Sequence, residues 1–162
     1  MTPAQTSGTA SLLKTIGAEL AAVEQFVDLL KLEQTELSTG NTDALPELAE
    51  RKSTLALQLS GLAAQRNAFL AAQGLAADRV GLATWCAKHP AEKKAAQAWD
   101  TLRALSGEAR ELIRVNGELI NIRMQYNARA LEALRAGSAT LDLYGPDGQA
   151  TTPGNRRIND AV

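Results

Sequence analysis

The stretch that decides the fold is WDTLRALSGEARELIRVNGELINIRMQYNARALEALRA, residues 99–136. Its apolar residues recur every three or four positions, a spacing that places them on one broad face of an α-helix. This stripe, which includes one polar residue, consists of Leu102, Leu105, Ala109, Leu112, Ile113, Asn116, Leu119, Ile120, Tyr126, Ala130, Leu131 and Leu134. Pro90 suits a first helical turn and Gly137 a C-terminal cap. We therefore predict a helix over 91–136, roughly 70 Å long at about 1.5 Å per residue.

The composition is that of packed helices. The chain has 162 residues, of which 45% are apolar but only 4% aromatic, and its formal net charge is −1. This charge balance gives no electrostatic case for binding nucleic acid. Residues 1–11 lack the features of a secretory signal, no apolar run is long enough to span a membrane, and a single cysteine rules out an internal disulfide. We expect a cytoplasmic protein without membrane insertion.

Two more long helices precede the stretch, over 10–38 and 43–73. The first carries Leu13, Ile16, Leu20, Val23, Val27, Leu30, Gln34 and Leu37 in alternating steps of three and four. The second carries Leu45, Leu48, Lys52, Leu55, Leu59, Leu62, Arg66 and Phe69 in the same steps. Such steps form a heptad seam, and the short turn over 38–43 predicts that the two helices pair as an antiparallel hairpin.

Polar residues interrupt these seams. Lys52 and Arg66 either pack their aliphatic stems and extend their charges to water, or set the register against the first helix, where Gln34 is also out of pattern. In the long helix, Asn116 is expected to fix register in the core, with direct contact to a partner as the alternative. Gly117 is expected to permit close approach of another helix.

The remaining segments complete an all-α architecture. Residues 1–9 are small and polar and are expected to be disordered. Within 73–88, Val80, Leu82, Trp85 and Cys86 are compatible with a short amphipathic helix, and residues 138–162 read as a flexible tail. The predicted fold is an elongated antiparallel bundle or coiled coil of three long helices and one short one, with a helical bundle domain over 1–137 and a flexible tail over 138–162.

The sequence offers little for catalysis. Cys86 and His89 are the only residues of their kinds, so a zinc site or a helical di-iron site lacks its other ligands. His89 lies in an expected turn close to Cys86, which does not favour a nucleophile and its base. We assign both residues a structural or neutral role. We expect no catalytic residue, no metal, no cofactor and no enzymatic activity.

Several blocks together resemble the FlgN-type flagellar export chaperones. The most specific are Asn116-Gly117-Glu118-Leu119-Ile120 inside the long helix and Leu143-Tyr144-Gly145-Pro146-Asp147-Gly148-Gln149 in the tail. Weaker blocks lie at 29–33, 48–57, 65–66, 99–102 and 156–158. The resemblance covers most of the chain, except for 74–92.

The resemblance implies a chaperone of flagellar type III export. Such a protein binds the C-terminal segments of hook–filament junction (hook-associated) proteins in the cytoplasm and delivers them to the export apparatus. It also suggests that Tyr144 docks on the cytoplasmic domain of the export gate, unless this ring folds back onto the long helix.

The lengths of the helices point to a binding site. The long helix exceeds the roughly 45 Å hairpin by about 20 Å at its C-terminal end. An apolar stripe without intramolecular cover is a partner site by default, and an amphipathic helix of a client would complete it. The candidate client-binding residues are Ile120, Met124, Tyr126, Ala130, Leu131 and Leu134. Homodimerisation or a folded-back tail would cover the same residues instead.

Two other functions compete with this one. A structural coiled-coil scaffold would use the same heptads but would self-associate and have no secreted client. A hydrolase or metal-binding bundle is disfavoured because the chain lacks the residues for either.

Overall fold

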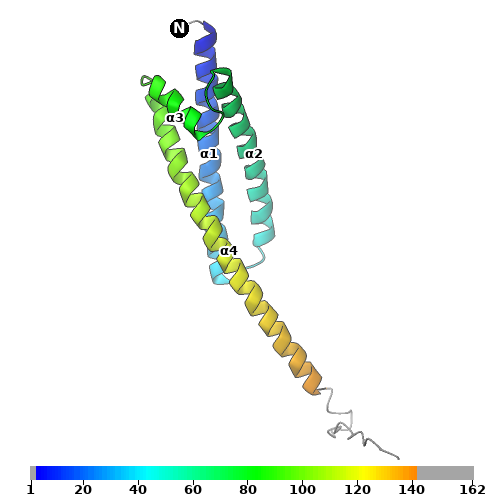
Figure 1. Ribbon diagram of the computed structural model, residues 1–162. Helices are drawn as coiled ribbons and strands as arrows, with labels where there is room; N and C mark the ends of the chain where they lie inside the picture. Colours follow the sequence, from blue (N-terminus) through cyan, green and yellow to red (C-terminus); the bar gives the residue numbers. More distant parts are fainter. Residues whose placement is uncertain (1–2, 142–162) are drawn as a thin grey trace, which may run out of the picture. The chain divides into compact units, whose positions relative to one another are not determined.

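The computed structural model describes the backbone of residues 3–141 and the side chains of residues 8–137. In this range the chain forms α1 (Pro3–Thr39), α2 (Leu45–Ala72), α3 (Arg79–Lys88) and α4 (Lys93–Leu141), as Figure 1 shows. All four elements are helices and no strand occurs among the described residues. The prediction of an all-α fold with three long helices and one short helix is confirmed.

The chain divides into two compact units. The first unit, Met1–Ile120, holds α1, α2, α3 and the N-terminal part of α4. The second unit, Asn121–Val162, holds the rest of α4. The predicted domain boundary after residue 137 stays a prediction.

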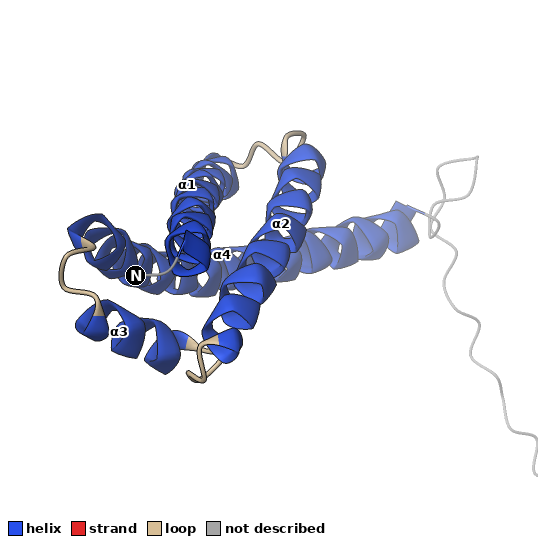
Figure 2. Cartoon of the chain, turned by 90° about the horizontal axis from the view of Figure 1, so that it is seen from above, coloured by secondary structure: helices blue, strands red, loops and turns tan. Residues whose placement is uncertain are grey.

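In the first unit, α1 and α2 lie side by side and the N-terminal part of α4 runs along α1, while α3 joins the end of α2 to the start of α4 (Figures 1 and 2). Apolar residues from all four helices form one core. Its buried members are Leu12, Ile16, Val23, Val27, Leu30, Leu70, Leu82, Trp85, Ala95, Trp99, Leu102 and Ala109. The heptad seams predicted for α1 and α4 supply six of these twelve residues.

The start of α1 and the end of α4 differ from the prediction. Residues 1–9 were expected to be disordered, but α1 begins at Pro3. Thr9 is buried, and a Cβ atom at Gly8 would lie 3.1 Å from Cε2 of Phe69, so the first turns of α1 pack against α2. The prediction that Gly137 caps the long helix is also wrong, because α4 continues to Leu141. A glycine inside a helix costs only about 1 kcal/mol relative to alanine, which does not stop a long helix.

The α2–α3 connection is fixed by local hydrogen bonds. Gly74 has φ +69°, and its N–H donates to the carbonyl of Ala71 at 2.9 Å, which ends α2 with a left-handed residue. The Asp78 carboxylate accepts from the N–H groups of Val80 at 2.8 Å and Gly81 at 3.0 Å and caps α3. Gly81 is required here, because a Cβ atom would lie 1.8 Å from the carbonyl oxygen of Ala76.

The short helix itself is confirmed, and three of its four predicted apolar residues pack in or against the core. Leu82 and Trp85 are fully buried and Cys86 is half-buried. Val80 is exposed and is not part of the buried face. It is the second residue of α3, and the two residues directly after it, Gly81 and Leu82, are buried. Val80 therefore lies on the solvent side of a helix whose opposite side packs in the core.

Two ion pairs join α1 to α2. The guanidinium of Arg66 donates to both carboxylate oxygens of Glu19, and Lys52 pairs with Glu33. Arg66 and Glu19 are both buried. The two glutamates and the two basic residues are each separated by 14 positions, as a single antiparallel register requires.

Of the two interpretations for Lys52 and Arg66, extension of the charge to water is wrong for Arg66. The ion pairs fit the register interpretation, although the partners on α1 are Glu19 and Glu33 and not Gln34. Glutamates on a helix ordinarily face solvent, so their burial depends on the basic residue opposite.

Asn116 ties α4 to the same place. Its Nδ2 donates to the backbone carbonyl of Leu30 at 2.9 Å and to Oε2 of Glu33 at 2.8 Å, and the residue is 2% exposed. The Glu33 carboxylate thus joins α1, α2 and α4, which confirms the structural role predicted for Asn116. The expectation for Gly117 is wrong, because among the described residues no heavy atom of another element lies within 4 Å of a Cβ atom at this position.

We predict that Arg66→Met destabilises the protein by about 3–5 kcal/mol, because it leaves the Glu19 carboxylate buried without its partner. The double variant Glu19→Leu/Arg66→Met removes both charges and should regain most of this loss. Urea unfolding followed by circular dichroism measures both values. A double variant that is as unstable as Arg66→Met, or less stable, would contradict the pairing.

Candidate functional site

Helix α4 presents its buried face in a seven-residue repeat. Leu102, Ala109 and Asn116 are buried at successive seven-residue intervals. The neighbouring positions of the same seam, Leu105, Leu112 and Leu119, are half-buried. This pattern of heptad packing reaches Leu119 and fixes which side of α4 faces the core.

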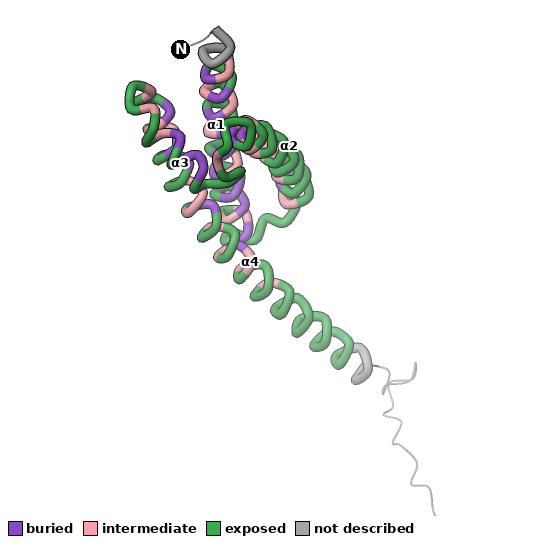
Figure 3. Tube along the Cα trace, turned by 45° about the horizontal axis from the view of Figure 1, so that its top comes forward, coloured by how far each residue is buried: buried purple, intermediate pink, exposed green. Residues whose placement is uncertain are grey.

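Burial then stops. From Ile120 to Gly137 every side chain is exposed except half-buried Arg123. Figure 3 shows this change along α4, from mixed buried and intermediate residues to exposed ones. An amphipathic helix that keeps apolar side chains in this range offers them to a partner.

All six candidate client-binding residues are exposed in this range. They are Ile120, Met124, Tyr126, Ala130, Leu131 and Leu134, and the exposed fraction of the five larger ones runs from 39% at Ile120 to 73% at Tyr126. Their role as a binding site stays a prediction, because no partner is present.

The six residues occupy two sides of the helix. At about 100° per residue, Ile120, Met124, Leu131 and Leu134 fall within an arc of roughly 80°. We call these four residues the outer face. Tyr126 lies about 120° from Ile120 and, with Ala130, continues the heptad register of the buried seam. The single stripe predicted from the sequence is therefore two adjacent stripes.

The sequence pattern missed two exposed isoleucines. Ile113, assigned to the core stripe, is 50% exposed. It lies two turns before Ile120, on the same side of α4 as the outer face. Its position directly after the seam residue Leu112 is the signal that identifies it. Ile122 is 62% exposed and lies on the opposite side of α4 from the outer face.

The charges along α4 change at the same place. Arg114 pairs with Glu111 and Glu118, and these contacts raise the pKa of Arg114 and lower that of Glu111. Between Asn121 and Gly137 the helix carries Arg123, Arg129 and Arg135 but only one acidic residue, Glu132. The exposed apolar residues therefore stand on a basic segment.

Cys86 and His89 have structural surroundings. The ring of His89 stacks on Trp85 with centroids 4.3 Å apart, and its Nδ1 lies 2.8 Å from the Trp85 carbonyl oxygen. Burial raises the pKa of the Cys86 thiol, which leaves less of the reactive thiolate. In the part of the chain that the structure describes, no three His, Cys, Asp or Glu side chains gather as metal ligands.

Tyr144, the predicted gate-docking residue, lies outside the described residues. So does the predicted tail over 138–162, apart from the last turn of α4.

The described residues thus form an all-α protein whose longest helix bears exposed apolar side chains on a basic segment. Comparison with family models identifies the family: residues 1–152 match the model described as FlgN protein, and the chain belongs to this family. Family membership makes it a chaperone of flagellum assembly. Comparisons with curated proteins and with solved structures give no match. Among the described residues, no helix has the length and apolar character needed to cross a membrane.

Proposed function

We propose that the protein is a cytoplasmic type III export chaperone that binds the C-terminal segments of hook-associated proteins and delivers them to the flagellar export apparatus. The family assignment supports a chaperone role in flagellar export, and the exposed apolar residues of α4 support the choice of binding site. The observation that carries this proposal is the exposure of large apolar side chains from Ile120 onward.

The outer face suits an amphipathic helix of the client. Met124 and Leu131 are seven residues apart, and Leu134 follows after three, which is the spacing of anchors in helix-in-groove recognition. Methionine adapts its shape to different partners, which suits a chaperone with more than one client. The arginines beside this face favour a client helix with acidic residues along its edge.

Binding needs no cofactor and no chemical step. The client segment gains apolar contacts that replace those of its final assembly, so it is held back from premature association. Release then requires a competing partner at the export apparatus. We propose that Tyr144 contacts the cytoplasmic domain of the export gate and that client binding and gate docking use separate residues of the chain.

We predict that Leu131→Asp weakens binding of a hook-associated C-terminal peptide by at least about tenfold, because a charge replaces an apolar anchor. Isothermal titration calorimetry with the peptide measures the affinity. The matched control is Ile122→Asp, which places the same charge on an exposed isoleucine at the opposite side of α4 and should change the affinity little.

Neither substitution should lower the melting temperature much, since both side chains are at least half exposed. Equal weakening by both variants would place the client elsewhere, and unfolding of Leu131→Asp alone would assign Leu131 to a packed interface. A large homo-oligomer whose molar mass in light scattering does not change when the peptide is added would favour the scaffold function.

For the tail, we predict that Tyr144→Ala leaves peptide affinity and helix content unchanged but reduces binding to the gate domain and secretion of the hook-associated proteins. A pulldown with the client-loaded chaperone and the gate domain tests it. Full-strength binding by the variant would refute the role of Tyr144, and loss of peptide binding would refute the separation of the two surfaces.

A further inference from the structure

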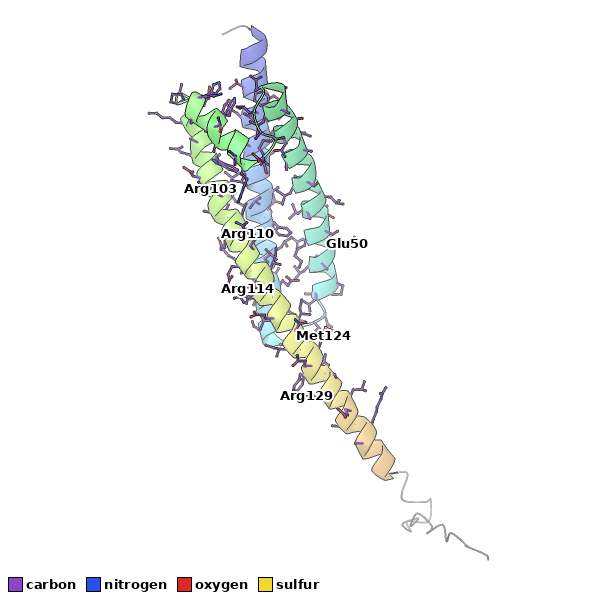
Figure 4. The ribbon with its side chains drawn as sticks, in the orientation of Figure 1. Glu50, Arg103, Arg110, Arg114, Met124 and Arg129 are labelled. Atoms are coloured by element: carbon purple, nitrogen blue, oxygen red, sulfur yellow. The ribbon has the colours of Figure 1, made fainter. Side chains whose placement is uncertain are left out.

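A cavity of about 520 Å³ lies in the first unit, where all four helices meet. Its walls come from Glu19 on α1, Arg66 on α2, Arg79 on α3, and Trp99, Arg103 and Arg110 on α4. A second cavity of about 390 Å³ shares Arg79, Trp99 and Arg103 with it. Residues distant in the sequence thus line one continuous region, and Figure 4 shows Arg103 and Arg110 on the first half of α4.

The region is strongly positive. Four arginines line the larger cavity, against the single acidic residue Glu19. Its carboxylate is already bound by Arg66. Arg103 has only an exposed contact of 3.8 Å with Asp100, which is worth little in water. Within the described residues, neither Arg79 nor Arg110 has a salt bridge. The chain as a whole has a formal net charge of −1, so this excess is local.

Packing of the bundle does not require these three arginines. Arg79, Arg103 and Arg110 are all exposed, unlike Arg66. Arg79 is the first residue of α3, where the positive end of the helix dipole disfavours a cation. Arg103 and Arg110 are seven residues apart and therefore project from the same side of α4. Like charges held together in this way repel one another, and a bound anion relieves that repulsion.

We propose that this arginine-lined cavity binds a small anion that carries several carboxylate or phosphoryl groups. Guanidinium groups bind both kinds of oxygen in a planar, two-pronged geometry. The cavity has the volume of a typical small-molecule site. Trp99, Val23 and Leu102 supply an apolar wall, so the anion sits against buried surface and is less exposed to screening by salt. The site uses none of the six residues proposed to bind the client.

The test is calorimetric titration of the full-length protein with citrate and, separately, with pyrophosphate. Sodium acetate at matched ionic strength is the control for simple screening. Binding of either multivalent anion, with a rise in melting temperature that acetate does not give, is the expected result. Preference for citrate assigns the site to carboxylates, and preference for pyrophosphate assigns it to phosphoryl groups.

Arg103→Gln and Arg110→Gln should each lower the affinity about tenfold, the effect of losing one charge-assisted contact. Both side chains are exposed, and circular dichroism verifies that the variants fold. Arg129→Gln is the matched control. It removes the same charge from the part of α4 that lies in the second unit and should leave the affinity unchanged.

Absence of binding by both anions would overturn the proposal. An equal loss in Arg129→Gln and Arg103→Gln would also overturn it, since the effect would then reflect net charge and not this cavity. Arg110→Lys keeps the charge but loses the two-pronged geometry, so it should bind between the wild type and Arg110→Gln. Wild-type affinity in Arg110→Gln would remove that residue from the site and contradict the proposal.

Discussion

The carboxylate of Glu33 is the constraint on which the bundle depends. One oxygen meets Lys52 of α2 and the other accepts from Asn116 of α4, so a single side chain of α1 holds all three long helices. Seams of leucine and alanine alone permit neighbouring registers at similar cost, since a shift by one heptad replaces one apolar contact with another. A buried carboxylate permits only the register in which its partners are present, because losing one leaves a charge or amide unsatisfied.

The second pair, Glu19 with Arg66, applies the same rule two heptads away. Both pairs keep α1 and α2 in one antiparallel register, and the hydrogen bonds of Asn116 to Leu30 and Glu33 set the rotation of α4 against α1. That rotation directs Leu112 and Leu119 inward and leaves Ile113 and Ile120 exposed. The side of α4 on which Ile113 and Ile120 are exposed therefore follows from polar contacts in the core. The same core places Arg66 in the wall of the arginine-lined cavity, where Glu19 pairs with only one of the four arginines.

Much of this fold follows from sequence spacing. Heptad steps predict the three long helices, the turn over 38–43 predicts the hairpin, and Lys52, Arg66 and Asn116 stand out as polar residues in apolar seams. Their partners do not stand out, because Glu19 and Glu33 look like ordinary surface glutamates until the register is known.

The early start of α1 at Pro3 escapes prediction for a similar reason: its support comes from Phe69, about 60 positions away. The sequence predicts the residues of the outer face, but it does not separate them from the buried seam. Spacing by three and four positions is the same for two adjacent stripes. The arginine-lined cavity has no sequence signal at all, because its residues come from four helices.

Hydrogen exchange with mass spectrometry tests the central claim most directly, which is that α4 packs in the bundle up to Leu119 and offers its following apolar residues to a client. In the free protein, amides of residues 95–119 should exchange slowly and those of 121–137 quickly, because only the former belong to a buried seam. Addition of a hook-associated C-terminal peptide should slow exchange in 121–137 and leave 95–119 unchanged. Protection confined to α1 and α2, or slow exchange of 121–137 before any peptide is added, would contradict the account.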